Sequence, residues 1–127
     1  MKNKMDPALR EELKKNFRNN LLETLELISS KKDQLEYQKN VPVAYVSAEI
    51  FCWWEDDYQI PKNEDWYQEA FSKGELEILA EFDKEFEIVA NKTPDNLPDI
   101  EEFVLTPEWR ELSSAAKAAL KKLVSLG

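Results

Sequence analysis

Apolar residues recur every three or four positions along much of the chain, which is the spacing of helices with one buried face. The first run follows Asp6 and Pro7, residue types that suit a helix N-cap and the first helical position. It predicts a helix over about residues 7–30. Another leucine lies seven residues beyond this run, so the pattern leaves open whether the helix stops there or continues through 31–39. The apolar stripe consists of Leu9, Leu13, Phe17, Leu21, Leu25 and Ile28.

Three later segments show the same helical spacing, and each is bounded by residues that start or stop helices. Ser47 is the expected cap of a helix over 48–58, which must end before Pro61. A capping box precedes a helix over 73–90, and a threonine followed by a proline opens the last helix, over 107–124. The side chains expected in the core are Ile50, Phe51, Trp54, Tyr58, Leu76, Leu79, Phe82, Phe86, Val89, Trp109, Leu112, Ala116, Ala119, Leu120 and Leu123.

The segments between these helices are short. VPVAYV, at 41–46, is β-branched and aromatic around a proline, which predicts extended backbone and leaves room for one lone short strand. Residues 61–71 and 97–105 are each expected to hold a short helical turn within a loop. With 127 residues and no internal repeat, the chain is expected to form a single all-α domain of about four main helices, spanning residues 1–127.

The inventory of reactive side chains argues against catalysis. The chain has no histidine and one cysteine, so it lacks the residues of the usual catalytic triads and zinc sites. Its two glycines are too few for a phosphate-binding loop or a dinucleotide-binding motif. Adjacent acids at 55–57 point in different directions on a helix and cannot converge on one ion. Glu77, Glu81 and Glu85 share a face that is expected to be outward and wet. The chain is therefore expected not to be an enzyme, and to hold no metal and no cofactor.

The expected compartment is the cytoplasm. The N-terminal residues lack the apolar stretch of a signal peptide, and no segment approaches the roughly 18 apolar residues of a membrane span. Cys52 has no second cysteine to pair with, which favours a reducing environment, and its place on an apolar helix suggests a buried structural thiol.

The negative charge is concentrated in the middle of the chain. Residues 41–105 carry four Lys/Arg against seventeen Asp/Glu, whereas the whole chain has a formal charge of -9. Such a segment repels phosphate, so no nucleic-acid partner is expected, but it attracts a basic protein surface. The alternative is an ordinary solvated acidic face.

Two adjacent tryptophans stand directly before the acids of EIFCWWEDDYQ. Trp54 falls on the core stripe of its helix, whereas Trp53 lies more than about 100° from the centre of that stripe. Either the helix is covered nearly all round, or Trp53 is a surface anchor for a partner, a role for which tryptophan and tyrosine are favoured. The candidate partner-binding residues, chosen from acids and aromatics in the middle of the chain, are Glu49, Trp53, Asp56, Asp57, Glu64, Asp65, Trp66, Tyr67, Glu77 and Glu81.

Repulsion along the helix at 73–90 adds weak support for a cationic partner. Glu77/Glu81, Glu81/Glu85 and Asp83/Glu87 are like-charge pairs four residues apart, and each costs about 0.2–0.5 kcal/mol in an isolated helix. A basic partner would relieve this repulsion.

The stretches VPVAYVSAEIFCWWEDDYQ, FSKGELEILAEFDKEF and LPDIEEFVLTPEWRELSSAAKAAL resemble small acidic bacterial immunity proteins of polymorphic or contact-dependent growth inhibition toxin systems. The resemblance covers about residues 41–120 and rests on pattern, so it assigns no residue roles. It implies a cytoplasmic inhibitor that binds one cognate toxin domain, often a nuclease, and blocks it.

Two other functions stay open. One is a general interaction or regulatory module whose apolar groove takes a partner helix, and the other, less favoured, is a small carboxylate-based enzyme. The neighbouring gene would discriminate best, because a secreted-toxin gene directly upstream supports immunity. Neither the toxin nor the oligomeric state follows from the sequence.

Without histidine or a second cysteine, the purified protein should retain no stoichiometric transition metal and should show no hydrolase activity of its own. Elemental analysis and standard esterase, phosphatase and nuclease assays check this. Tightly retained zinc or iron would contradict it.

Overall fold

The computed structural model describes residues 6–93 and 96–126, and every regular element within these ranges is a helix. The all-α prediction is confirmed. The prediction of about four main helices is too low, because short helices occupy the connections and the first helical region is divided in two. The elements are α1 (Pro7–Ser29), α2 (Lys31–Asn40), α3 (Val46–Trp54), the π-helix η1 (Glu55–Gln59), α4 (Asp65–Glu69), α5 (Lys73–Lys92), α6 (Ile100–Phe103) and α7 (Pro107–Leu126).

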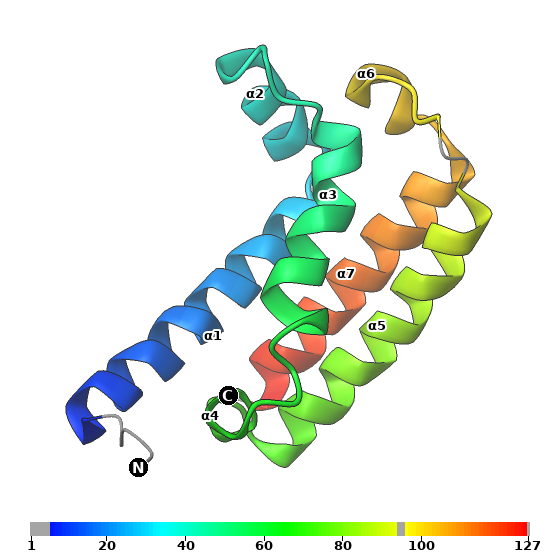
Figure 1. Ribbon diagram of the computed structural model, residues 1–127. Coiled ribbons are helices and arrows are strands. Elements are labelled where there is room, and N and C mark those ends of the chain that lie inside the picture. The colour runs from blue at the N-terminus through cyan, green and yellow to red at the C-terminus, as the bar shows by residue number, and fades with distance from the viewer. Residues whose placement is uncertain (1–5, 94–95, 127) are drawn as a thin grey trace.

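Helix α7 is the centre of the arrangement, because it packs along both α1 and α5. Ion pairs between Lys122 and Glu81 and between Lys92 and Glu111 join opposite ends of α5 and α7, which shows that these two helices are antiparallel. Helix α3 and η1 run across this layer, with α4 below them and α2 and α6 at the other end (Figure 1). The bundle thus has one long-helix layer and one covering segment.

The covering segment is fixed by Trp54, which is completely buried as predicted. Its ring stacks on Tyr58 with centroids 4.7 Å apart and meets Phe82 edge-on at 4.6 Å. The indole N–H donates to Asp83 Oδ1 at 2.9 Å, so the one polar atom of this core ring is satisfied. These contacts hold α3 and η1 against α5.

The first helical region breaks at Ser30, so the alternative of one helix continuing through 31–39 is wrong. Ser30 has extended backbone (φ -115, ψ 106) and its side chain accepts a hydrogen bond from the N–H of Asp33. Gln34 completes the break. Its side chain is fully buried, and Nε2 donates to the carbonyl oxygens of Leu27 (2.9 Å) and Ile28 (3.0 Å). Carbonyl groups at the end of α1 thereby gain the partners that a continuing helix would have supplied.

Residues 41–45 form a turn, so the short strand that the sequence allowed at 41–46 does not form. The N–H of Ala44 donates to Val41 O, and the side chain of Gln38 bonds the carbonyl of Ala44 and the N–H of Val46. A strand needs a neighbouring strand as its partner, and within the described residues these backbone groups are bonded by a turn and one side chain instead.

The predicted cap of the next helix is also wrong. Helix α3 begins at Val46, and Ser47 lies inside it, buried, with its hydroxyl donating to the carbonyl of Pro98 at 2.7 Å. The serine ties α3 to the segment before α6. The sequence could not distinguish the two roles, because both use the same hydroxyl group.

The other start signals act as expected. Asp6 accepts from the N–H of Ala8, Ser72 and Glu75 form the capping box of α5, and Thr106 Oγ1 accepts from the N–H of Trp109. The short helical turns expected within 61–71 and 97–105 are α4 and α6.

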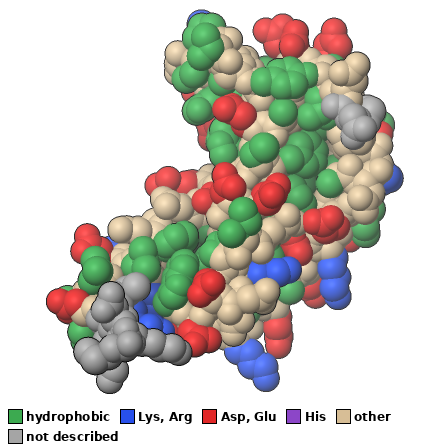
Figure 2. All heavy atoms as spheres, viewed as in Figure 1, with side chains coloured by type: hydrophobic (Ala, Val, Ile, Leu, Met, Phe, Trp, Pro, Cys, Tyr) green, Lys and Arg blue, Asp and Glu red, His purple; other side chains and the backbone are tan. Residues whose placement is uncertain are grey.

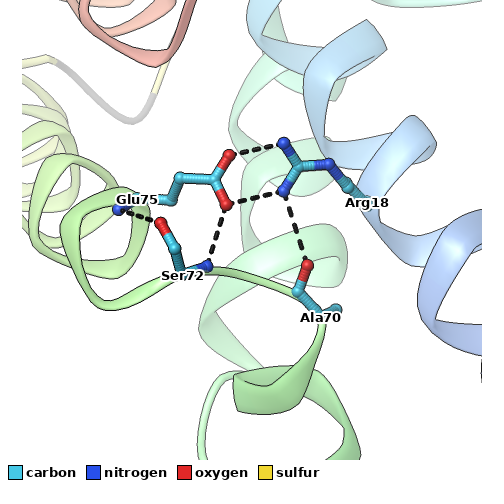
Figure 3. A network of polar contacts seen from close by, with 4 residues as sticks. All are labelled: Arg18, Ala70, Ser72 and Glu75. Carbon is cyan, nitrogen blue, oxygen red and sulfur yellow. Dashed lines mark hydrogen bonds and ion pairs between the residues drawn. The ribbon is translucent and has the colours of Figure 1, made fainter. Parts of the chain in front are cut away.

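A partly buried ion pair joins α1 to the beginning of α5 (Figure 3). Arg18 donates from both terminal nitrogens to the carboxylate of Glu75, one bond being 2.8 Å long, and its Nη1 also reaches the carbonyl of Ala70 at 3.4 Å. Glu75 accepts from the N–H of Ser72 at 2.8 Å as well. The hydrogen bonds from Arg18, followed by those from Ser72, hold the pKa of Glu75 below its usual value despite its burial.

Replacing Gln34 by Met should destabilise the protein by roughly 2–5 kcal/mol, because two backbone carbonyls and the indole N–H of Trp109 lose a buried partner. Urea unfolding followed by circular dichroism measures this. Lys32→Met, at an exposed position of the same helix, is the control and should change stability by less than about 0.5 kcal/mol. Equal effects of the two substitutions would show that the buried amide is not needed.

Candidate protein-binding surface

The candidate residues chosen from sequence do not form one surface. Three groups lie on different elements. The groups at α4 and on α5 border depressions that also contain Lys or Arg side chains, whereas the depression beside α3 and η1 has no Lys or Arg among the described residues that line it. The group on α3 and η1 is Glu49, Trp53, Asp56 and Asp57; the group at α4 is Glu64, Asp65, Trp66 and Tyr67; the group on α5 is Glu77 and Glu81.

Tyr67 is not a surface residue, so its selection as a binding residue is wrong. Its side chain is fully buried among the core aromatics, and its hydroxyl donates to the backbone carbonyl of Asp57 at 2.8 Å. Burial, followed by the nearby Tyr58 and Asp57, raises the pKa of the Tyr67 hydroxyl. The neighbouring Trp66 is half-buried and packs on Phe17, with ring centroids 4.6 Å apart.

Trp53 is neither a fully buried core residue nor a freely exposed surface anchor, the two roles that the sequence left open. The side chain is half-buried and meets Tyr37 of α2 edge-on, with centroids 5.4 Å apart and planes at 84°. Glu49, one turn earlier, is also half-buried, and its Oε2 is buried without a hydrogen-bond partner among the described residues. Trp53 therefore joins α3 to α2 and still contributes to the surface.

The expectation of a buried thiol is wrong, because Cys52 is exposed. It stands two positions from each of the fully buried side chains Ile50 and Trp54. Two helical steps rotate a side chain by about 200°, so Cys52 lies on the outer side of α3. The apolar residues around Cys52 in the sequence suggested burial, although Cys52 itself faces outward.

Trp53 lines a shallow surface depression that we call the acidic–aromatic hollow. Its two connected parts share Glu23, Leu27 and Tyr37, so they form one continuous surface. None of the lining residues is Lys or Arg. The hollow is lined by Asn20, Glu23, Thr24, Glu26, Leu27, Asp33, Glu36, Tyr37, Asn40, Trp53 and Asp57.

Two helical stripes build most of the hollow. Each stripe consists of a first residue and the residues three, four and seven positions after it. On α1 these are positions 20, 23, 24 and 27, and on α2 they are positions 33, 36, 37 and 40. Residues with this spacing lie on one face of a helix. The break at Ser30 turns α2 relative to α1, so the two stripes border one depression where α3 passes both helices (Figure 1).

Figure 2 shows acidic side chains spread over the visible face of α1, α3 and η1, whereas Lys and Arg lie mostly toward its lower edge. In the same view the outline of the molecule is notched between α1 and α2.

Asp57 enters the hollow from the π-helix. The N–H of Ile60 donates to the carbonyl of Glu55, five residues earlier, and the wide turn between them carries Asp57 toward α1. There its Oδ2 accepts from the hydroxyl of Thr24. Burial raises the pKa of Asp57, and the charges of Asp56 and Glu23 raise it further, whereas the hydrogen bond from Thr24 opposes the shift.

Several acids on α5 have partners within the chain. Asp83 accepts from Trp54 and from Gln59, whose Nε2 also bonds Glu87. Lys122 pairs with Glu81 at 3.2 Å. The repulsion predicted along α5 is therefore relieved in part within the chain, at Glu81, Asp83 and Glu87.

The carboxylates of the hollow differ from these acids. Among the residues described, none of Glu23, Glu26, Asp33, Glu36 and Asp57 forms an ion pair. Four of these five acids lie in the first 40 residues, which sequence reasoning passed over because that segment has slightly more Lys/Arg than Asp/Glu. The helical spacing of the two stripes was the signal that could have revealed them.

The described residues show no arrangement of three or more His, Cys, Asp or Glu side chains suited to a metal ion. None of the described helices combines the length and the apolar character needed to cross a membrane. The expectations about metals, catalysis and compartment stay predictions.

No protein-family model matches the sequence, and no curated protein or solved structure is significantly similar to it. The case for a function consequently depends on the hollow itself.

Asp57→Asn should gain stability relative to the wild type as the pH rises. Because the pKa of Asp57 is above its ordinary value of 3.8 in the folded state, the wild type loses stability as the pH increases from about that value through the raised one. Asparagine does not ionise and avoids this loss. Urea unfolding at several values between pH 3 and pH 7 measures the difference.

Asp56→Asn removes one charge from the adjacent exposed residue and is the control, expected to change stability by less than about 0.5 kcal/mol. A difference between Asp57→Asn and the wild type that stays constant with pH, or reverses, would contradict the assignment.

Proposed function

We propose that this chain is an inhibitor of the immunity type, which binds a basic toxin domain, of the nuclease kind, through the acidic–aromatic hollow and neutralises it. The observation that carries the proposal is the set of five carboxylates around Tyr37 and Trp53 that form no ion pair with any residue the structure describes, in a depression with no Lys or Arg among its described lining residues. Acids elsewhere, such as Asp83 and Glu81, have partners within the chain.

Charge complementarity supports this kind of partner. A nuclease must hold phosphate groups, and the Lys and Arg that do so make its cleft a target for carboxylates. The formal charge of -9 adds a long-range attraction that speeds the encounter with a basic protein. Exposed acids outside the hollow, including Asp56, Glu64, Asp65 and Glu77, contribute to this attraction without requiring direct contact.

The two aromatic residues supply short-range contact energy, which long-range attraction between charges does not provide. Binding energy at protein interfaces is concentrated in a few side chains, and tryptophan and tyrosine are among the commonest of these. Trp53 and Tyr37 are already packed against each other, so little conformational freedom remains to be lost on binding. The hollow thus combines rigid aromatic contacts with a surrounding field of negative charge.

One observation favours the alternative, a module that receives a partner helix. A groove between α5 and α7 contains Ile78, Phe82 and three alanines at its base, with the charged side chains of Glu81, Lys84, Glu85 and Lys122 beside them. Ile88 on α5 is 50% exposed. Small side chains allow another helix to approach closely. Ala118→Arg would block this groove and leave the hollow unchanged, so it separates the two functions.

The direct test uses the gene next to the one that encodes this chain. If that gene encodes a toxin, its C-terminal domain should stop growth when produced alone, and coproduction of this chain should restore growth. The two purified proteins should form a complex whose association slows as salt is added, because screening acts over about 10 Å at 0.1 M. Restored growth that depends on Ala118 rather than on the hollow would favour the groove.

Charge reversal within the hollow should weaken binding more than the same change elsewhere. Glu23→Lys with Glu36→Lys should raise the dissociation constant about 100-fold or more, because two contacts become repulsive. Glu64→Lys with Glu77→Lys is the matched control, since both pairs are exposed and each change adds four positive charges.

The control should lose only the long-range part, about 10-fold or less, and mainly in the association rate. Surface plasmon resonance separates the two rate constants. Equal losses for the two double variants would show that net charge, and not the hollow, determines binding.

A further inference from the structure

We propose that the part of the hollow beside the contacting rings of Tyr37 and Trp53 is a receptor site for one arginine side chain of the partner. We call this part the aromatic corner. Its inner boundary comes from α1, its aromatic walls from α2 and α3, and one carboxylate from η1. The corner is lined by Asn20, Glu23, Thr24, Leu27, Tyr37, Trp53 and Asp57.

The two rings provide a place for a flat cation. Tyr37 and Trp53 stand at 84° to each other with centroids 5.4 Å apart, so they form two walls at nearly a right angle. Both rings are half-buried and both line the depression. A guanidinium group is planar and weakly hydrated and stacks on aromatic faces, indole being the best of them.

The carboxylates provide the counter-charge. One oxygen of Asp57 is occupied by the hydroxyl of Thr24, and Oδ1 accepts no hydrogen bond from any residue that the structure describes. Glu23, whose charge acts on Asp57, lines the same depression without an ion pair in the described part of the chain. Two carboxylates with free oxygens suit the several N–H groups of one guanidinium.

The remaining lining residues fit the rest of the side chain. Leu27 offers apolar surface to the methylene groups, and the amide oxygen of Asn20 can accept a further N–H bond. Among the described residues that line the corner, none carries a positive charge that would oppose a cation.

Other cations fit less well. A divalent metal ion needs several oxygen ligands at one point, and no group of three or more such side chains occurs among the described residues. A quaternary ammonium group cannot donate hydrogen bonds to Asp57, Glu23 or Asn20. Lysine can donate them, but its compact ammonium group is more strongly hydrated and lacks the planar fork.

This inference rests on the proposed function for the identity of the partner, but binding of arginine can be measured without that partner. The whole chain, labelled with ¹⁵N, is titrated with N-acetyl-arginine amide while the indole N–H signal of Trp53 is followed by NMR. Trp53→Phe assigns the signal. The matched probes are N-acetyl-lysine amide and N-acetyl-citrulline amide, since citrulline keeps the shape of arginine and removes its charge.

Arginine amide should shift the Trp53 signal with a saturating curve and a dissociation constant on the order of 10 mM, as expected for one stacked and charge-paired side chain. Lysine amide should bind several-fold more weakly, and citrulline amide at least about 10-fold more weakly. Glu23→Gln with Asp57→Asn should weaken arginine binding about 10-fold or more. Glu64→Gln with Asp65→Asn removes the same charge outside the corner and should change it less than about 2-fold.

Equal shifts with citrulline and arginine, or equal losses in the two double variants, would overturn the arginine site. Glu23→Gln alone, at an exposed position, keeps the test valid if the double variant unfolds. If arginine amide binds but the neighbouring gene product is not neutralised, the site stands and the proposed function is wrong. If neutralisation occurs and arginine amide does not bind, the function stands and the site is wrong.

Discussion

The arrangement of this protein depends on one buried amide. The side chain of Gln34 makes three hydrogen bonds, two to carbonyls at the end of α1 and one from the indole of Trp109 on α7. The bond from the indole of Trp109 gives that buried N–H its partner, whereas the carbonyl of Leu27 also accepts from the N–H of Ser30. Together the three bonds of Gln34 join the end of α1, the beginning of α2 and the central helix. The direction of α2 follows from these bonds, and with it the position of the stripe that faces α1 across the hollow.

The distribution of charge has a similar structural cause. Counted along the sequence, residues 1–40 carry nine Lys/Arg against seven Asp/Glu, and residues 41–105 contain most of the acids. In space, acids on α5 meet bonding partners from α7 and from the α3–α4 region, whereas Glu23, Glu26, Asp33 and Glu36 gather on one side of α1 and α2. The acids of residues 1–40, which are nearly balanced by Lys and Arg along the sequence, are thereby gathered in one place on the surface of α1 and α2.

The helical class, the positions of the long helices and most of the core follow from periodicity and capping residues. Leu21, Trp54, Leu79 and Phe86 are buried because they occupy the apolar stripe of a 3.6-residue period. Leu9 is 55% exposed, since the stripe near the start of α1 extends beyond the helices that cover its later turns. The break at Ser30 could not be predicted, because it depends on a glutamine whose partners come from α1 and from Trp109, 75 positions later.

The hollow contains only some of the residues that the sequence suggested for partner binding. Trp53 and Asp57 lie in the hollow, but the other lining residues come from α1 and α2, which a search of acidic segments overlooked. Tyr67 shows the converse error, since an aromatic residue among acids in sequence was completely buried in space. A surface that two helices form across a bend has no signature within either helix, and only the matching stripes indicate it.

The π-helix carries a consequence for how the sequence can change over evolutionary time. A hydrogen bond that closes over five residues holds one residue more than an α-helical turn, so loss of any one residue from 55–59 would restore a regular α-helix. Every later position of that helix would then rotate by about 100°. Asp57 would leave Thr24, and Tyr58 would leave the ring of Trp54. In this segment insertions and deletions are therefore far more restrictive than substitutions, and descendants that keep the hollow should keep the length of the segment even where its residues differ.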